Sequence, residues 1–153
     1  MISKKTKYAL KAVIYLARKY EKGPVLIADL AKEENIPKKF LELILLSLKN
    51  NGILSSKKGK GGGYYLAKSP RMVSFGQVVR IMEGTLAPVP CVSVSSYEKC
   101  EECEDESTCG IRIVMKDVRD AIAEILDSAT LAEVLEKIDM ARQQGKDILN
   151  FVI

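Results

Sequence analysis

The chain has 153 residues, 47% of them hydrophobic and 29% charged, which is enough for one core with an extension but not for two large domains. It contains no histidine, which excludes histidine general acid–base catalysis and histidine metal ligands and leaves almost no support for an enzyme. Residues 1–71 carry 16 lysines and arginines against 5 acidic residues, whereas residues 72–153 carry 8 against 15. Only the first half therefore favours a polyanionic partner.

The first predicted helix spans about four turns and begins among lysines. Its apolar positions are Tyr8, Leu10, Val13, Ile14 and Ala17. Cations at a helix start oppose the helix dipole, so Lys4, Lys5 and Lys7 need another partner, and DNA phosphate is a good one. Lys11 interrupts the apolar run and no cleavage site follows, so we expect no signal peptide, no membrane span and a cytoplasmic location.

A helix-turn-helix is predicted next. After a short strand at Val25-Leu26, a second helix covers Ile27 to Glu34, and Asn35-Ile36-Pro37 forms the turn. The following helix ends at Gly52 and buries Leu41, Ile44, Leu45 and Leu48. Its first turn displays Lys38, Lys39 and Glu42 away from that face, where a recognition helix contacts DNA.

A basic hairpin follows the recognition helix. Two extended runs, Ile53–Lys58 and Tyr64–Lys68, flank the glycine-rich turn at 59–63. Lys57, Lys58 and Lys60 supply charge, and glycine lets the backbone approach a phosphate closely. Tyr64 is a further candidate DNA contact in this hairpin. The spacing matches neither a dinucleotide fingerprint nor a phosphate-binding loop. The fold expected for residues 1–70 is therefore a winged helix-turn-helix head, mainly α with a small β-wing.

Residues 71–109 follow the head and are predicted to form one helix and a sensor loop. The 71–87 segment contains a helix that Ser74 caps, that Gly84 ends and that packs on the head. Residues 88–109 form an irregular loop with four cysteines, a cluster that in an intracellular protein indicates metal or redox chemistry. These are Cys91, Cys100, Cys103 and Cys109.

The last two segments are predicted to be helical. Residues 110–128 form a helix whose stripe is too apolar for solvent, so a partner helix must cover it and the chain should be a homodimer. Packing of this helix on its own head is the alternative. Residues 129–153 hold a short helix capped by Thr130, a polar hinge and an apolar tail.

Several of these motifs together resemble the Rrf2 family of winged-helix transcription regulators, which includes IscR-like iron–sulfur, NsrR-like nitric-oxide and CymR-like cysteine-metabolism regulators. The matching stretches, in order, are 3–10, Phe40-Leu41-Glu42, Gly61-Gly62-Gly63-Tyr64 and 126–131. The resemblance implies a dimeric cytoplasmic repressor joined through the 110–128 helix and bound to a roughly palindromic DNA operator. It also implies that Glu42 reads bases, while Lys58 and Gly59 lie where the wing enters the minor groove.

The cysteine loop resembles that of the cluster-bearing members. Cys103 and Cys109, with Cys91 upstream, fit iron–sulfur ligation, with a 2Fe–2S cluster favoured over 4Fe–4S. Arg112 and Lys7 stand where relatives place their fourth ligands, and neither cation is a ligand, so Cys100 is expected to replace them. The acidic neighbours raise the thiol pKa values, and one of their carboxylates is the alternative oxygen ligand. These are Glu98, Glu101, Glu102, Glu104, Asp105 and Glu106.

Three interpretations of the cysteines stay open at this point. The first is a repressor controlled by an iron–sulfur cluster. The second is a thiol-redox or cysteine-metabolism repressor without a cluster, in which two cysteines form a disulfide. The third is a constitutive DNA-binding protein with a structural zinc site.

The C-terminal tail suggests a further partner. Phe151 and Ile153 resemble the aromatic-x-Ile ending of CymR-like repressors, which work with a cysteine synthase that also accepts partner tails ending in isoleucine. The tail is thus a candidate ligand for such an enzyme. Docking of the same residues on the dimer is the alternative.

Overall fold

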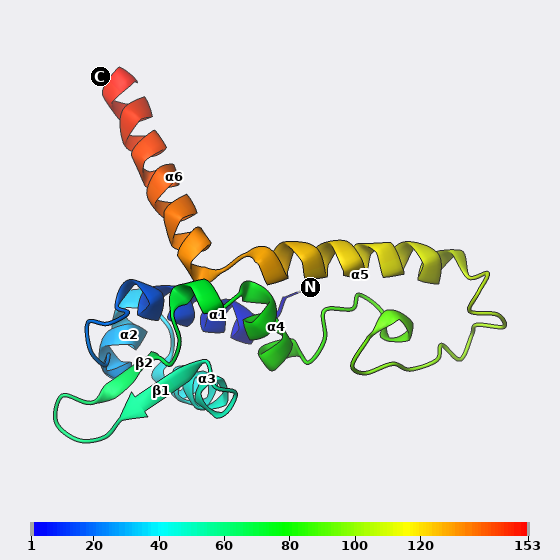
Figure 1. Cartoon of the computed structure of the whole chain (residues 1–153), viewed down its shortest axis with the longest axis horizontal. Coiled ribbons are helices and arrows are strands. Elements are labelled where there is room, and N and C mark those ends of the chain that lie inside the picture. Colours follow the sequence, from blue (N-terminus) through cyan, green and yellow to red (C-terminus); the bar gives the residue numbers. More distant parts are fainter. Residues whose placement is uncertain (1, 153) are drawn as a thin grey trace.

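The computed structural model describes residues 2–152, which form six α-helices, two short 3-10 turns and one two-stranded antiparallel sheet (Figure 1). The helices are α1 (Lys4–Arg18), α2 (Ile27–Glu34), α3 (Lys38–Asn50), α4 (Phe75–Glu83), α5 (Gly110–Ser128) and α6 (Leu131–Val152). The strands are β1 (Leu54–Lys57) and β2 (Gly63–Leu66), and the 3-10 turns lie at Pro70–Met72 and Pro90–Val92.

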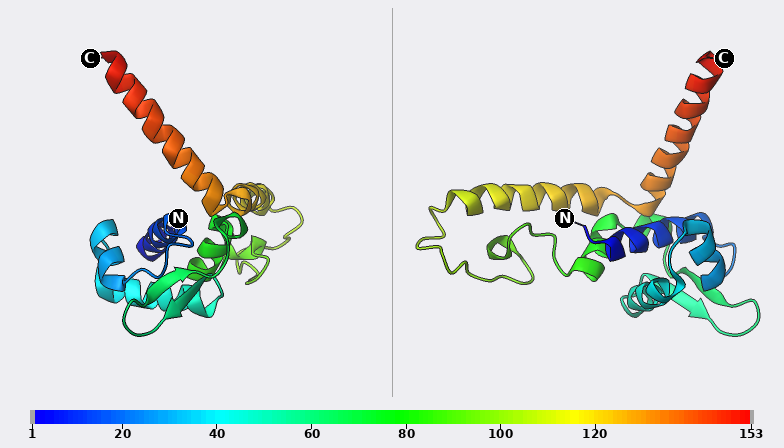
Figure 2. Two further views of the ribbon diagram at one scale, coloured as in Figure 1. Left: turned by 60° about the vertical axis from the view of Figure 1, so that its left-hand side comes forward. Right: turned by 180° about the vertical axis from the view of Figure 1, so that it is seen from behind.

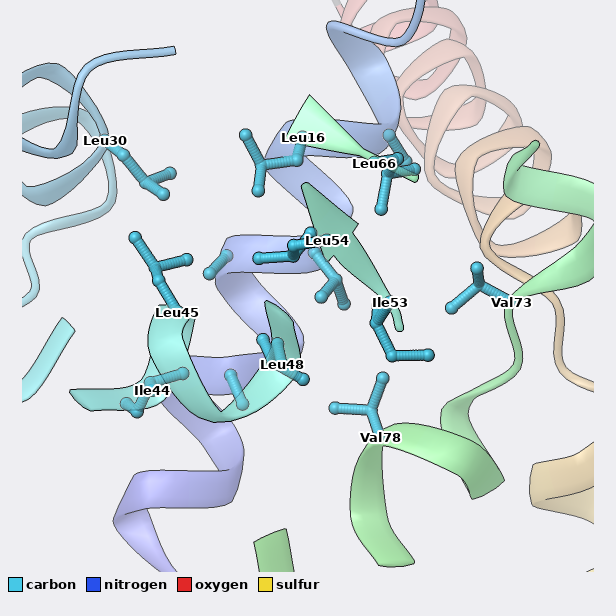
Figure 3. Close-up of a cluster of buried hydrophobic side chains, with 14 of the residues drawn as sticks. Leu16, Leu30, Ile44, Leu45, Leu48, Ile53, Leu54, Leu66, Val73 and Val78 are labelled. Carbon is cyan, nitrogen blue, oxygen red and sulfur yellow. The ribbon is translucent and has the colours of Figure 1, made fainter. Parts of the chain in front are cut away.

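The hydrophobic core joins α1, α2, α3, the hairpin and α4. The four α3 positions expected to face inward, Leu41, Ile44, Leu45 and Leu48, are all at most 1% exposed. Figure 3 shows three of these side chains meeting others from α1, α2, both strands and α4. Burial of such side chains contributes about 1.5–3 kcal/mol each, so this cluster fixes the orientation of α3.

The wing is built by the hairpin of β1 and β2. Leu54 pairs with Leu66 and Lys57 pairs with Gly63. Val25 adds one bridge at the edge, since its N–H and carbonyl each bond to Tyr64 at 2.8 Å. A Cβ at Gly63 would lie 2.2 Å from the carbonyl oxygen of Val25, so only glycine permits this approach.

Helix α4 begins and ends as its sequence indicates. Ser74 and Gln77 form a reciprocal capping box, and Gly84 ends the helix with φ of +82°. The same region anchors α6, because the N–H of Leu131 donates to the carbonyl of Val73 at 2.8 Å and Leu131 itself is fully buried. The mainly α winged-helix fold with a long helix after the loop is therefore confirmed.

Helices α5 and α6 extend away from the head in different directions (Figures 1 and 2). Arg18 on α1 pairs with Asp139 on α6 at 2.8 Å. The C-terminal part of α6 projects away from the head (Figure 1). The predicted short C-terminal helix followed by a polar hinge is wrong, since α6 continues to Val152. Residues 141–147 are all exposed, so the helix continues there without an apolar stripe to reveal it.

Candidate DNA-binding surface and cysteine cavity

A groove lies between the start of α3 and the wing. It has a volume of about 490 Å³, and residues from both elements line it. Of the predicted DNA-binding residues, Lys38, Glu42, Lys57, Lys58, Gly59 and Tyr64 all contribute to this lining. One exposed carboxylate and several lysines therefore share a concave surface on the recognition helix and the wing.

The remaining predicted DNA-binding lysines lie outside that groove. Lys39 and Lys60 are exposed on α3 and at the wing tip, and Lys4, Lys5 and Lys7 are exposed on the first turns of α1. Aromatic contacts connect α1 to α3: the Lys4 ammonium lies 5.8 Å from the Tyr8 ring, which packs edge-on against Phe40 with 6.5 Å between ring centroids. The N-terminal half of α1 thus contacts the first turn of α3.

All four cysteines line a single cavity of about 280 Å³ in the loop between α4 and α5. Cys91, Cys103 and Cys109 are half-buried, whereas Cys100 is exposed, and all four are free thiols. Arg112, Glu98 and Glu106 also line the cavity. Sequence spacing could not show that Cys91 meets the other cysteines, because an irregular segment separates them.

The electrostatics of the cavity disfavour ionised thiols when no cation is bound. Partial desolvation raises the pKa of the Cys103 thiol, and the neighbouring Cys109, Cys100 and Glu106 raise it further. Asp105, by contrast, is held in a local turn by Ser107 and Thr108, and these hydrogen bonds lower its pKa. A bound cation would relieve the repulsion among ionised thiols.

The donor set suits a thiophilic metal group, although it is not assembled around one point. Within residues 2–152, no three cysteine, aspartate or glutamate side chains stand close enough together to hold a metal ion. The four thiols nevertheless share one cavity, and thiolate is the preferred ligand of iron in clusters. The residues present therefore fit an iron–sulfur cluster if the loop closes around it.

Two arginines on α5 hold the segment that carries Cys91. Arg112 Nε donates to the Cys91 carbonyl at 3.3 Å, and Arg119 Nη1 donates to the carbonyl of the buried Val92 at 2.7 Å. No sequence signal singles out Arg119, and Arg112 stands out in the sequence only as a cation that cannot serve as a cluster ligand. Nothing in their spacing shows that they bond to a segment more than twenty residues earlier.

The far end of α5 is fixed to α4. The Arg80 guanidinium bonds to both carboxylate oxygens of Asp127, at 2.5 and 2.9 Å. The Asp127 carboxylate also crowds Gly76, because a Cβ there would lie 1.9 Å from its Oδ1. The two ends of α5 thus contact the cysteine loop and the head respectively.

An apolar stripe on α5 is uncovered in the single chain. The helix has no buried residue, and Ile111, Val114 and Ile125 are 56–68% exposed. A groove lined by α4, the 85–88 segment and α5 continues the stripe at Ile122, Ile125 and Leu126. Such a surface is typical of a helix that packs on another chain.

The predicted tail site cannot be placed. Ile153 lies outside the described residues, and for Phe151 the description covers the backbone but not the side chain. Among the helices that are described, none is long and apolar enough to cross a membrane.

Comparisons with known proteins agree with one another. The model of the Rrf2 family, described as an iron-dependent transcriptional regulator, matches residues 2–137. An rrf2-like HTH-type transcriptional regulator of Rhodobacter capsulatus is 43% identical over 88% of this chain and 92% of its own. The structure of CymR, the global cysteine regulator of B. subtilis, has a TM-score of 0.75 at 32% identity and covers 90% of this chain and 97% of its own. The structure of T. potens IscR has a TM-score of 0.74 at 27% identity and covers 92% of this chain and 90% of its own.

Proposed function

This chain belongs to the Rrf2 family of transcriptional regulators and is not an enzyme, and we propose that it is a homodimeric repressor controlled by an iron–sulfur cluster in the cysteine cavity. We assign the DNA-binding head to residues 1–70, the segment that contains α4 and packs on the head to 71–87, and the sensor loop to 88–109. Residues 110–128 are the dimerisation helix, and 129–153 are the C-terminal helix and tail. The observation that carries the proposal is the meeting of all four cysteines in one cavity.

The groove between α3 and the wing is the surface that reads DNA. Lys38 and Glu42 lie one helical turn apart and line the groove together with Lys57 and Lys58. Lysines that contact phosphates give affinity but little sequence preference, whereas a carboxylate can accept a hydrogen bond from a cytosine amino group. Glu42 is therefore the residue expected to select bases, and Lys58 a residue expected to bind the backbone.

The dimer forms through α5. Its uncovered apolar stripe gives a second copy the apolar surface that a stable interface needs, and a symmetric dimer presents two recognition helices to a palindromic operator. None of the α5 residues belongs to the core cluster of the head, so the stripe stays available to a second copy.

The cluster is held by thiols of the cysteine cavity, with Cys91, Cys100, Cys103 and Cys109 as the candidate donors. The family description as iron-dependent supports iron over zinc. When bound, the cluster supplies a group whose oxidation state or integrity responds to the cell. The chain supplies the thiols and a loop that is fastened at defined points to α5.

The hydrogen bonds between the cysteine loop and α5 connect the loop physically to the head. Arg112 donates to the Cys91 carbonyl and Arg119 donates to the Val92 carbonyl. A displacement of Cys91 is therefore transmitted to α5 through these two hydrogen bonds. At its other end, α5 is bonded to α4 through Arg80 and Asp127. A change at the cysteines thereby changes the angle between α5 and the head, and in a dimer it changes the spacing of the recognition helices.

A thiol switch without a cluster is the second candidate. Cys109 lies close enough to Cys103 to raise the pKa of the Cys103 thiol, and the related CymR is a cysteine regulator. In that case an oxidant would join two of the four thiols as a disulfide. A zinc site in a constitutive DNA-binding protein is the third. A tail that binds a cysteine synthase stays a prediction without structural support.

Purification without oxygen separates these candidates. A cluster protein is brown and contains iron and acid-labile sulfide, a zinc protein is colourless and contains zinc, and a thiol switch contains neither metal. If the protein purified without oxygen holds no iron and takes up none on reconstitution, the cluster proposal is wrong.

A further inference from the structure

The acidic segment of the cysteine loop contains one carboxylate that differs from its neighbours. Glu98, Glu101, Glu102, Glu104 and Asp105 are exposed, whereas Glu106 is half-buried. Glu106 also lines the cavity together with all four cysteines. Partial burial of a carboxylate beside four thiols is unfavourable unless something in the cavity attracts its charge.

The orientation of Glu106 is set from across the loop. The phenol of Tyr97 donates a hydrogen bond to Glu106 Oε1, which leaves the second carboxylate oxygen free to accept another partner. Asp105, the adjacent acid, uses both oxygens in its local turn with Ser107 and Thr108. Of the acids in this segment, Glu106 is thus the half-buried one that lines the cavity, and within the described residues one of its carboxylate oxygens has no hydrogen-bond partner.

Cys100, unlike Glu106, is exposed to solvent. It is the exposed member of the four cysteines, and its carbonyl accepts the N–H of Cys103 in a turn at the rim of the cavity. The three half-buried thiols, Cys91, Cys103 and Cys109, lie deeper. Glu106 stands midway between Cys103 and Cys109 in the chain, three residues from each.

We propose that the Glu106 carboxylate, held by Tyr97, completes the cluster's donor set as an oxygen ligand with Cys91, Cys103 and Cys109, and that Cys100 is not a ligand. The inference rests on the cluster-based function proposed above. Iron accepts carboxylate oxygen, and a carboxylate carries the same charge as a thiolate, so the charge of the set is unchanged. Oxygen binds cluster iron less firmly than sulfur does, so the iron held by Glu106 is the one most easily removed.

The test uses the full-length protein reconstituted without oxygen with iron and sulfide. Glu106→Gln removes the anionic oxygen at nearly constant size, and Tyr97→Phe removes only the hydrogen bond that orients it. Glu98→Gln is the matched control, because Glu98 lines the same cavity but is exposed. Cys100→Ser tests the competing ligand. The readouts are iron and sulfide per chain, the visible absorbance spectrum and the half-life of the cluster in a chelator.

Glu106→Gln is expected to shift the absorbance spectrum and to shorten the half-life in chelator at least tenfold. Tyr97→Phe should shorten it less, and Glu106→Cys should lengthen it. Cys100→Ser and Glu98→Gln should match the wild type. Circular dichroism of each cluster-free variant verifies that the head is folded.

A wild-type spectrum and half-life for Glu106→Gln, or loss of the cluster in Cys100→Ser, overturns this inference while leaving the cluster proposal intact. A wild-type protein that holds no iron overturns both, so the two failures are distinguishable.

Discussion

The carboxylate of Glu83, the last residue of α4, accepts the backbone N–H of Ser3 at 2.8 Å, although 80 residues separate the two in sequence. The same oxygen also accepts the hydroxyl of the fully buried Thr6. The first turn of α1 contains Lys4 and Lys5 but no acid, so Glu83 supplies the negative charge that a helix start favours. The end of α4, where the cysteine loop begins, is thus fastened to the lysine-bearing start of α1.

The pH dependence of stability should reveal this contact. Hydrogen bonds from Ser3 and Thr6 lower the pKa of Glu83 from 4.5 to about 2. A lowered folded-state pKa contributes stability that is complete above the unfolded value of 4.5 and is lost as the pH falls toward 2. Glu83→Gln should lower the free energy of unfolding at pH 7 by about 1 kcal/mol, less than the about 1.5–3 kcal/mol of a buried hydrogen bond to a charged group, because solvent screens the partly exposed carboxylate.

Urea unfolding of the cluster-free protein at pH 7 and pH 3 measures the effect. The difference between wild type and Glu83→Gln should shrink at pH 3. A Glu98→Gln control should match the wild type at both pH values, and an unchanged difference at pH 3 would contradict the assignment.

Arg119 should link the cysteine loop to α5. Its side chain is 19% exposed and donates to the Val92 carbonyl while pairing with Asp120. Arg119→Met keeps the aliphatic stem but leaves that carbonyl without its donor, which costs about 1–3 kcal/mol locally. The ratio of operator affinities with and without the cluster should therefore fall at least threefold in this variant. Asp120→Asn, which removes the ion pair but spares the Val92 bond, is the control and should keep the ratio.

The amino-acid sequence predicts the head well because its signals are local. The three- and four-residue spacing in α3, the Ser74–Gln77 capping box and the glycines of the wing each act within a few residues. The continuation of α6 escaped prediction because Gly145 and its polar neighbours lack an apolar period. There the helix carries a side-chain hydrogen bond between Gln143 and Asp147.

Substitutions of Lys58 and Glu42 should change different properties of DNA binding. Lys58→Ala should weaken binding to all duplexes and reduce the slope of log affinity against log salt by about 1 per protomer, because one phosphate contact is lost. Glu42→Ala should relax base preference at one operator position and change the salt slope little. Fluorescence anisotropy on a selected operator and on single-base variants measures both. If either variant bound all duplexes as the wild type does, its assigned contact would be wrong.

The dimer should depend on the α5 stripe. Val114 is 56% exposed in the single chain. Val114→Glu loses about 1.5–3 kcal/mol of side-chain burial in each of two copies, so dimer dissociation should rise at least 100-fold. Lys116→Glu, on the exposed polar side of the same helix, should leave the dimer intact. Analytical ultracentrifugation at micromolar concentration measures the oligomeric state of the wild type and both variants. A wild-type protein that is monomeric at that concentration would refute the dimer.

The candidate site was predictable in its residue types but not in its arrangement. The cysteines, the lysines of the wing and Glu42 stand out in the sequence because their chemistry is unusual for a structural role. The bonds from Arg119 to Val92 and from Glu83 to Ser3, and the half-burial of Glu106, depend on how distant segments pack. No local period or motif encodes those contacts, so sequence analysis missed them.

Operator binding by the same preparation with and without its cluster tests the central claim most directly. Protein purified without oxygen should be brown, contain iron and sulfide, and change its affinity for a selected operator at least tenfold when the cluster is removed by a chelator and restored by reconstitution. A colourless protein that takes up no iron, or equal operator affinity in the loaded and stripped forms, would contradict it.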